Sequence, residues 1–486
     1  MNTADFGDNR WKILCGCYEG AEKIAVDLIY AAVSKYTEYV LVCEESTKIG
    51  LDDLKDINPI FIGTAKSNEY IKKFIEDGTI ELPSGEEGYL INVVTSAFNP
   101  EKQMIVIAGT DANGVIYGAI DFESRYLAEN AIFTHEIEKD FKKYFRITMP
   151  EYHRVSAPDI KNRAIWTWGH VIYDYRGFID NMMKLKLNMI VIWNDHVPLN
   201  ARDVVEYAHA RGIRVIFGYS WGWGVDVDIS SRSSIEKWSE MALESYEKNY
   251  RDLGGDGIYF QSFTETQDEQ KDGVIIAGAV RDWVNIIGGK ILSVYPDLEI
   301  QFGLHATSVR NKLEFIKEVD ERISIIWEDC GAFPYHYVPK MLDGFQETKD
   351  FSSRIATLRG NTDRFGVVLK GLICLDWLNF EHQKGRFVMG VSDETKIKSR
   401  TGEKTRYWRY VQAYWLQNSK YVMEILRLFK DERGKDITVQ ALVEDGMLES
   451  RLWFPVALYA EMLWNCSADP AELMCSVALN PDVTFA

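Results

Sequence analysis

Apolar runs that alternate with amphipathic segments dominate the pattern of this chain. Eight short runs rich in β-branched residues end in aromatic and polar side chains, and a segment of helical periodicity follows each of them. The runs span residues 163–168, 189–195, 215–221, 258–265, 300–305, 323–329, 367–376 and 386–392. Such alternation is typical of βαβ units in a parallel sheet, and eight units are what a closed barrel requires. The pattern therefore predicts an α/β protein built on a (β/α)8 TIM barrel.

Both ends of the chain depart from this pattern. Before the barrel, strand-like runs at 39–43, 59–63, 89–94 and 104–109 are interleaved with helical patterns at 21–33, 68–77 and 113–129, which indicates an N-terminal α/β sandwich domain. A linker at 136–160 follows, and a long helix at 404–428 is expected to finish the barrel. We expect three parts: an α/β domain at 1–150, a catalytic barrel at 151–430 and a helical, strand-free C-terminal extension at 431–486.

Charge and composition narrow the class of partner. The net charge of -18 and the pI of about 5.0 are unfavourable for binding nucleic acid or an anionic membrane. The N-terminus lacks the basic and apolar segments of a signal peptide, and no apolar run is long enough to span a bilayer, so we expect a cytoplasmic protein. The seven cysteines show no zinc spacing. We expect no cofactor and no metal, a carbohydrate as substrate, and a homodimer through the C-terminal helices as one arrangement.

Carboxylates stand where three of the predicted strands end. The carboxyl ends of barrel strands hold the active site, and the fourth, sixth and seventh runs deliver Glu265, the adjacent pair Glu328 and Asp329, and Asp376. Glycosidic bond cleavage needs two carboxyl groups, one to donate a proton and one to activate water or attack the anomeric carbon. Neighbouring residues of a strand point to opposite faces, so at most one of Glu328 and Asp329 is expected to face the pocket.

Aromatic, amide, imidazole and basic side chains surround these carboxylates in the sequence. Flat aromatic rings pack against sugar faces while polar neighbours bind the hydroxyl groups, and a basic side chain would be needed for an anionic sugar. The residues expected to bind the substrate are Trp168, Trp193, Asn194, His196, Trp221, Trp223, His305, Trp377, Arg163 and Lys370.

Three stretches resemble known glycosidases. The segment 109–118, the first barrel run at 162–168 and the run at 185–194 are similar to glycoside hydrolases that join an N-terminal α/β domain to a catalytic barrel. These are the family 67 α-glucuronidases and the family 20 β-N-acetylhexosaminidases. The hexosaminidases place an Asp before the acidic Glu of the fourth strand, whereas Thr264 precedes Glu265 here. Resemblance to the α-glucuronidases implies a lone Glu acid, base carboxylates from strands six and seven, and an inverting mechanism.

These observations predict an exo-acting glycoside hydrolase for short oligosaccharides or small glycosides, with a uronic acid among the candidate terminal sugars. Glu265 is the expected general acid, and Asp376 with Glu328 or Asp329 forms the base side. Three alternatives remain open at this point. They are a retaining, hexosaminidase-like hydrolase, a metal-dependent sugar isomerase or lyase with His305, Glu265 and Asp329 as ligands, and a sugar-binding protein without catalysis.

Overall fold

The computed structural model describes residues 10–486 except 38, 129–148, 169–171, 195, 220–227, 262–263, 265–267, 331–343, 361–363, 373–384, 392, 444–445 and 447. The chain forms two compact units. The first comprises Met1–Pro158, Ala210–Gly212 and Ala478–Asp482, and the second comprises Asp159–His209, Ile213–Val477 and Val483–Ala486. Among the described helices, none combines the length and apolar character that crossing a membrane requires.

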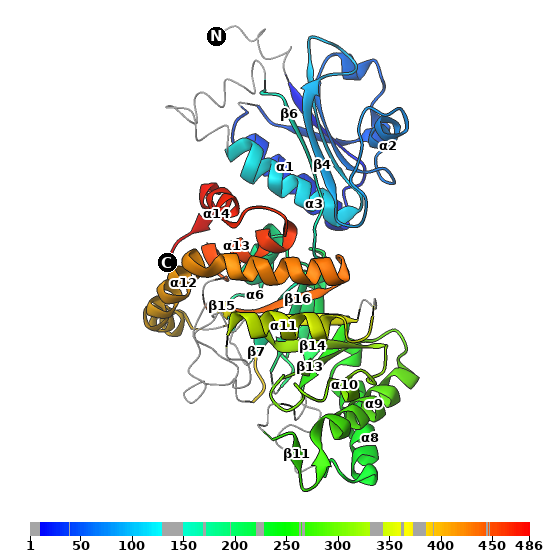
Figure 1. The fold of residues 1–486 in the computed structure, drawn as a ribbon. Helices are drawn as coiled ribbons and strands as arrows, with labels where there is room; N and C mark the ends of the chain where they lie inside the picture. The colour runs from blue at the N-terminus through cyan, green and yellow to red at the C-terminus, as the bar shows by residue number, and fades with distance from the viewer. Residues whose placement is uncertain are drawn as a thin grey trace. The chain divides into compact units, whose positions relative to one another are not determined.

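The first unit is a six-stranded sheet covered by helices on both faces. Its strands are β1 (Trp11–Cys15), β2 (Val42–Glu45), β3 (Asn58–Thr64), β4 (Tyr89–Thr95), β5 (Gln103–Gly109) and β6 (Tyr152–Ser156), in the order β2-β1-β3-β5-β4-β6. β4 is antiparallel to both of its neighbours, and the other pairs are parallel. Helices α1 (Gly20–Ser34) and α3 (Ala112–Asp121) lie on one face, and α2 (Glu69–Glu76) lies on the other (Figure 1). The predicted α/β sandwich is confirmed.

Two strands of this sheet were not predicted. β1 precedes the first predicted element, and β6 lies inside the predicted linker at 136–160. β6 is an edge strand that pairs only with β4 among the described strands. Its residues alternate between half-buried and exposed, so it lacks the continuous apolar run that marks the inner strands. An edge strand needs only one buried face, which explains why the apolar sequence pattern of β6 is weak.

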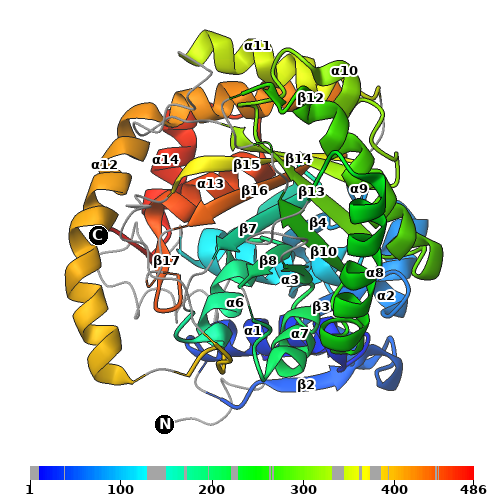
Figure 2. The same cartoon turned by 90° about the horizontal axis from the view of Figure 1, so that it is seen from below.

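The second unit is a closed barrel of eight parallel strands, which confirms the predicted fold class (Figure 2). Around the ring the order is β10-β13-β14-β15-β16-β7-β8-β9. The bounds are β7 (Asn162–Trp168), β8 (Met189–Trp193), β9 (Arg214–Gly218), β10 (Gly257–Gln261), β13 (Glu299–Leu304), β14 (Ile323–Cys330), β15 (Phe365–Leu372) and β16 (Thr438–Val443). The first seven correspond to the first seven predicted runs.

The eighth predicted strand is wrong. Residues 386–391 form no strand, and β16 closes the ring instead. Within that segment Gly390 has a left-handed backbone with a φ of 76°, and the backbone N–H of Met389 donates to Asn200 Oδ1 at 2.8 Å. The turn at Gly390 and the hydrogen bond from Met389 to Asn200 are incompatible with a continuous strand in this segment. The tail beyond residue 430 is therefore not strand-free, since it contains β16, β17 (Leu452–Trp453) and β18 (Val483–Thr484).

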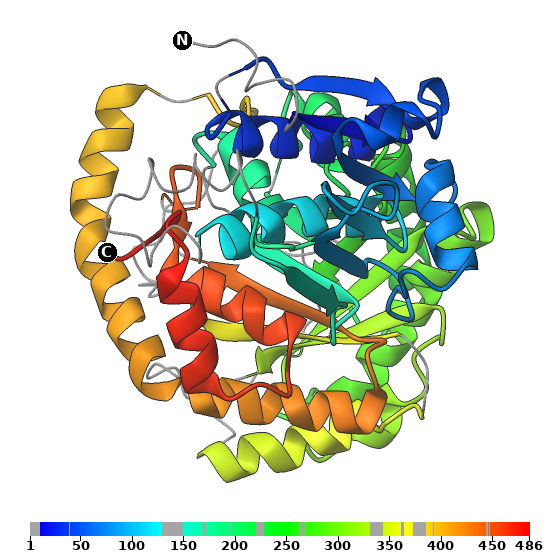
Figure 3. The ribbon, with the colours of Figure 1, turned by 90° about the horizontal axis from the view of Figure 1, so that it is seen from above.

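Helices pack around the barrel. They are α6 (Tyr175–Lys184), α7 (Ala201–His209), α8 (Arg232–Asn249), α9 (Ile276–Val294), α10 (Leu313–Ile316), α11 (Phe345–Ala356), α12 (Glu394–Arg433), α13 (Phe454–Trp464) and α14 (Pro470–Leu479). The hairpin β11 (Gln270–Lys271) and β12 (Val274–Ile275) precedes α9. The predicted helix at 404–428 is the central part of α12, which runs for 40 residues along the outside of the barrel beside α13 (Figure 3).

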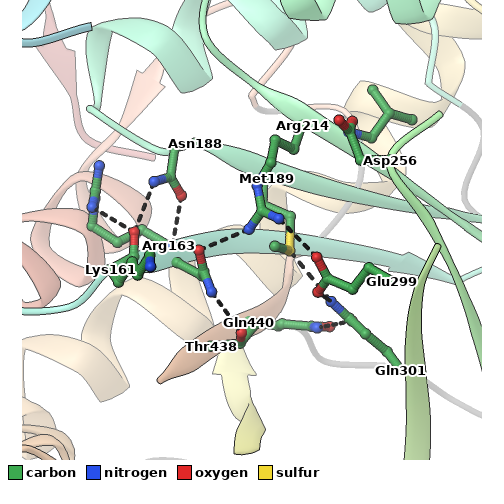
Figure 4. A network of polar contacts seen from close by, with 12 residues as sticks. Lys161, Arg163, Asn188, Met189, Arg214, Asp256, Glu299, Gln301, Thr438 and Gln440 are labelled. Carbon is green, nitrogen blue, oxygen red and sulfur yellow. Dashed lines mark hydrogen bonds and ion pairs between the residues drawn. The ribbon is translucent and has the colours of Figure 1, made fainter. Parts of the chain in front are cut away.

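Side chains fill the barrel interior in layers. The apolar middle consists of Ala164, Trp166, Met189, Val191, Trp193, Ile216, Tyr259, Ile326, Val368 and Leu442. The amino end of the interior is polar instead (Figure 4). There, Arg214 donates to Glu299 and to Asn162, both at 2.7 Å, and Gln440 donates to Gln301 at 2.7 Å. These residues come from four strands, so the network ties the bottom of the barrel together and leaves the opposite end for a site.

Candidate active site

A second polar layer lies at the carboxyl end of the barrel interior. Side chains along a strand alternate between its two faces. Glu328 and Lys370 stand two residues beyond Ile326 and Val368, which belong to the apolar middle of the barrel. Both polar side chains therefore face the interior, one layer closer to the end where barrel enzymes bind their substrates.

Glu328 is the centre of this layer. Its side chain is completely buried, with 0% exposure. Tyr259 Oη donates to its Oε1 at 2.5 Å, and Gln261 Nε2 donates to its Oε2 at 2.5 Å. His305 Nε2 lies 3.0 Å from the same Oε2. A buried carboxylate costs free energy unless its oxygens are paired, and here both oxygens have partners.

The structure thus shows one of the two adjacent carboxylates of β14 facing the interior. The sequence left this choice open between Glu328 and Asp329. Glu328 points inward, while the side chain of Asp329 lies outside the described part of the chain.

Gly303 makes the position of Glu328 possible. It lies on β13, between β10 and β14 in the ring. A Cβ atom at this residue would overlap Glu328 Oε1, and it would stand 2.6 Å from Tyr259 Oη. Only glycine leaves the space in which these two groups meet.

Three aromatic rings form a floor beneath the polar layer. The ring centroids of Trp166, Trp193 and Tyr259 are 5.6–5.8 Å apart in every pair. A Cβ at Gly218 would stand 2.5 Å from the Trp193 ring, so this glycine allows the indole to cross the end of β9. Aromatic surface beside fixed polar groups is typical of a pocket that binds a sugar ring.

Lys370 is a second buried charge in the same layer. It is 4% exposed, and its Nζ lies 5.2 Å from the centroid of the Trp166 ring. None of the described carboxylates forms an ion pair with it. A cation–π contact compensates an ammonium group only in part, which leaves this cation able to bind an anionic group of a ligand.

The residue that directly follows β13 joins two parts of the site. His305 contacts Glu328 through its side chain, and its backbone N–H donates to Thr264 Oγ1 at 2.9 Å. Ser308 Oγ donates to the Thr264 carbonyl at 2.8 Å. Thr264, which immediately precedes Glu265, is therefore fixed to the segment that follows β13.

Two residues expected to bind substrate follow β8. Asn194 is buried, and its Oδ1 has no hydrogen-bond partner among the described residues. Its oxygen is thus a candidate acceptor for a ligand hydroxyl group. His196 is exposed on the loop that follows.

Arg163 is not part of this site, which corrects the expectation that it binds an anionic sugar. It lies near the amino end of β7 and is completely buried. Its guanidinium donates to the carbonyls of Lys186, Ile160 and Lys161 at 2.8–3.0 Å and stacks 5.3 Å from the ring of Trp464. The neighbouring Ala164 faces the interior, so by alternation Arg163 faces outward.

Several predicted site residues lie outside the described residues. These are Glu265, Asp376, Trp221, Trp223 and Trp377, and the side chain of Trp168. Trp168 is the last residue of β7, where its backbone pairs with Trp193. Within the described part of the chain, no three metal-ligating side chains converge.

The sequence interpretation missed Tyr259, Gln261 and Gly303. The first two lie inside the fourth run, before its polar end, where the apolar pattern hides them. Alternation would have revealed them, because Gly257, Tyr259 and Gln261 share the face opposite to Ile258 and Phe260. Gly303 carried no such signal, because its role is to leave space for side chains from other strands.

Comparisons with known proteins assign no family. No family model matches the chain, and a search of the curated proteins found no match. Among solved structures, one described as "Structure of CpGH84D" aligns with 96% of this chain and 86% of that chain, at 12% sequence identity and a TM-score of 0.43. Similarity at this level is too weak to assign an activity.

Proposed function

We propose that this protein is an exo-acting glycoside hydrolase that cleaves a terminal sugar from short oligosaccharides or small glycosides. The observation that carries the proposal is the layer at the carboxyl end of the barrel interior. There a paired carboxylate and an imidazole, Glu328 and His305, stand above a floor of three aromatic rings. Such a combination of flat apolar surface and fixed polar groups suits a sugar ring.

The catalytic roles in this proposal come from the sequence. Glu265 follows Thr264, which is hydrogen-bonded to the segment that follows β13, and we assign Glu265 the role of general acid. Asp376, four residues beyond the end of β15, is assigned the base side together with Glu328 or Asp329. The inverting mechanism that we propose needs a carboxyl separation of ~6.5–9.5 Å, whereas a retaining mechanism needs ~5–5.5 Å.

Lys370 supports a uronic acid as the terminal sugar. Its ammonium group is buried in the same layer as Glu328, and none of the described carboxylates pairs with it. The carboxylate of a uronic acid would supply the missing anion. A neutral hexose or an N-acetylhexosamine offers no such group.

The test is a panel of aryl glycosides that includes α- and β-glucuronides and N-acetylhexosaminides. Hydrolysis is measured for the parent protein, for Glu265→Gln and for Glu269→Gln. Glu269 is a matched control in the same loop, where it accepts an exposed hydrogen bond from Asn311 at 2.9 Å. We expect Glu265→Gln to lose a factor of ~10² or more, as removal of a general acid does, and Glu269→Gln to retain activity.

Two outcomes would reject the proposal. If the parent turns over no glycoside but binds sugars equally well as Glu265→Gln, the protein is a sugar-binding protein. If chelation of divalent metal abolishes an activity on free sugars, the barrel is a metal-dependent isomerase or lyase.

A further inference from the structure

Two cysteine side chains lie in contact at one edge of the sheet in the first unit. Cys15 is the last residue of β1, and Cys43 belongs to β2, the outermost of the described strands on that side. Their sulfur atoms are 4.0 Å apart, and the Cys43 thiol donates a weak hydrogen bond to Cys15 Sγ. Both cysteines are free thiols. The contact joins residues that stand 28 positions apart in the sequence.

The strand register explains why these thiols meet. β1 and β2 are parallel, and Ile13 pairs with Cys43. Side chains of paired residues point to the same face of a sheet, and every second residue of a strand returns to that face. Cys15 stands two residues beyond Ile13, so it shares the face of Cys43. The two sulfur atoms therefore approach each other diagonally across the strand pair.

The two thiols differ in their access to solvent. Cys43 is exposed. Cys15 is 2% exposed, and its thiol donates to the Glu44 carbonyl at 3.5 Å. A small reagent can therefore reach Cys43 directly, and Cys15 is then the thiol that stands beside any group attached to Cys43.

Strand β2 can supply the movement that a bond between the two sulfur atoms needs. A disulfide holds its sulfur atoms ~2.05 Å apart, so the thiols must approach each other by ~2 Å. β2 has 4 residues and pairs with β1 alone among the described strands. A short edge strand is held by one set of backbone hydrogen bonds, so it opens more easily than an inner strand.

We propose that Cys15 and Cys43 form a reversible disulfide that locks the edge strand β2 onto β1. The oxidant is a small disulfide, R–S–S–R. The thiolate of Cys43 attacks one sulfur of the reagent, which forms Cys43–S–S–R, and the first RS⁻ leaves and takes up the proton that Cys43 lost. The thiolate of Cys15 then attacks the sulfur of Cys43, and the second RS⁻ leaves with the proton of Cys15. Two electrons pass from the cysteine sulfurs to the reagent, which departs as two molecules of thiol.

The surroundings of the pair set the rate and the effect of this reaction. The hydrogen bond to Cys15 raises the pKa of the Cys43 thiol above its ordinary value, and only a thiolate attacks a disulfide. The first exchange should therefore be slow near neutral pH. Once formed, the bond closes a loop of the chain that contains α1, and it restricts the unfolded state of that loop.

The first measurement is mass spectrometry of the full chain after long incubation with hydroxyethyl disulfide at about pH 8, where thiolate forms more readily. Remaining thiols are alkylated, and trypsin then releases the expected cross-link as residues 13–23 joined to residues 36–48. Residues 13–23 also contain Cys17, which is half-buried. Cys17→Ala is therefore the matched control.

We expect the parent and Cys17→Ala to give the cross-link, and Cys43→Ala to lose it. Cys15→Ala should stop at the mixed disulfide on Cys43, because the thiol that resolves it is missing. A parent chain whose Cys43 remains in the mixed disulfide would overturn the proposal. So would a cross-link that is kept in Cys15→Ala and lost in Cys17→Ala, because it would join Cys17 to Cys43.

The second measurement is hydrogen exchange of the full chain in its reduced and oxidised forms. A locked strand opens less often, so the amides of β2 that bond to β1 should exchange about 10-fold more slowly after oxidation. Dithiothreitol should restore the rate of the reduced chain. Cys43→Ala, whose substitution lies at an exposed position, should show no change on the same treatment. A parent that carries the cross-link but exchanges at β2 as fast as the reduced chain would contradict the locking of the strand.

Discussion

Tyr259 and Glu328 meet across an intervening strand. Tyr259 belongs to β10 and Glu328 to β14, with β13 between them in the ring, yet Tyr259 Oη donates to Glu328 Oε1 at 2.5 Å. The contact passes over Gly303 of β13, where any Cβ atom would overlap the carboxylate. Three strands must therefore carry the right residue for this one hydrogen bond to form.

Replacing Gly303 by alanine should disrupt this contact. The added Cβ would displace the Glu328 carboxylate and cost about 1–3 kcal/mol of unfolding free energy, as overpacking of a filled interior does. Activity on the glycoside substrate should fall with it. Gly289→Ala in α9 is the control, because a Cβ there meets nothing within 4 Å and should stabilise the helix by up to ~1 kcal/mol. Urea denaturation of both variants checks the difference, and equal stability would argue against a packed Tyr259–Glu328 contact.

Removing the charge of Lys370 should change substrate selectivity. Lys370→Met keeps much of the side-chain volume but removes the ammonium group that stands over Trp166. We expect kcat/KM to fall about 10-fold to 100-fold for a glycoside with an anionic terminal sugar, and to change much less for a neutral one. Lys398→Met, on the exposed side of α12, should leave both unchanged. An equal loss of kcat/KM on neutral and anionic glycosides would mean that Lys370 stabilises the barrel and does not bind an anionic group of the substrate.

Arg163→Gln should affect stability and spare catalysis. Its guanidinium satisfies three backbone carbonyls in a buried position, and leaving such acceptors unpaired costs about 2–4 kcal/mol of unfolding free energy. The folded fraction should hydrolyse the substrate with the kcat/KM of the parent. Arg232→Gln is a suitable comparison, because Arg232 is exposed and pairs only with Glu236 in α8 among the described residues. A selective loss of kcat/KM in Arg163→Gln would contradict its placement outside the site.

The sequence predicted the barrel well because its inner strands are buried on both faces. Seven of the strands read as short apolar runs with a helix after each, which is the signature of parallel strands. β16 was missed because it starts with Thr438 and includes Gln440. Both residues belong to the polar amino end of the interior, where Gln440 bonds Gln301. A strand that contributes polar groups to a buried network loses the apolar pattern by which strands are recognised.

The sequence predicted a residue of the candidate site only where a polar or charged side chain stood at the carboxyl end of a strand and also faced the barrel interior. Glu328, His305 and Lys370 stand at strand ends and carry recognisable chemistry. Arg163 carried the same chemistry, but its place in the alternation of β7 turns it outward. The space beside Gly303 is filled by side chains from two other strands. The sequence around Gly303 therefore gives no sign of this role.

The stability of the first unit should fall as the pH rises, because of Glu22. This residue of α1 is 8% exposed, and burial raises its pKa above the ordinary value for glutamate, while hydrogen bonds from Ser67, the Cys17 backbone and Thr64 offset part of the shift. A raised carboxyl pKa in the folded state means that the folded state holds the proton more tightly than the unfolded state. Its stabilising contribution is complete below the unfolded pKa and is lost as the pH rises through the folded pKa.

Glu22→Gln removes this dependence, because glutamine stays neutral at every pH. We expect the variant to be more stable than the parent near neutral pH, and the gap to close as the pH falls toward the ordinary glutamate pKa of about 4.3. Urea denaturation of the full chain from about pH 4 to about pH 8 measures the gap. Glu76→Gln on the exposed side of α2 should follow the parent. If Glu22→Gln instead becomes less stable than the parent as the pH rises, the buried carboxyl group is ionised and paired in the folded state, and its pKa is not raised.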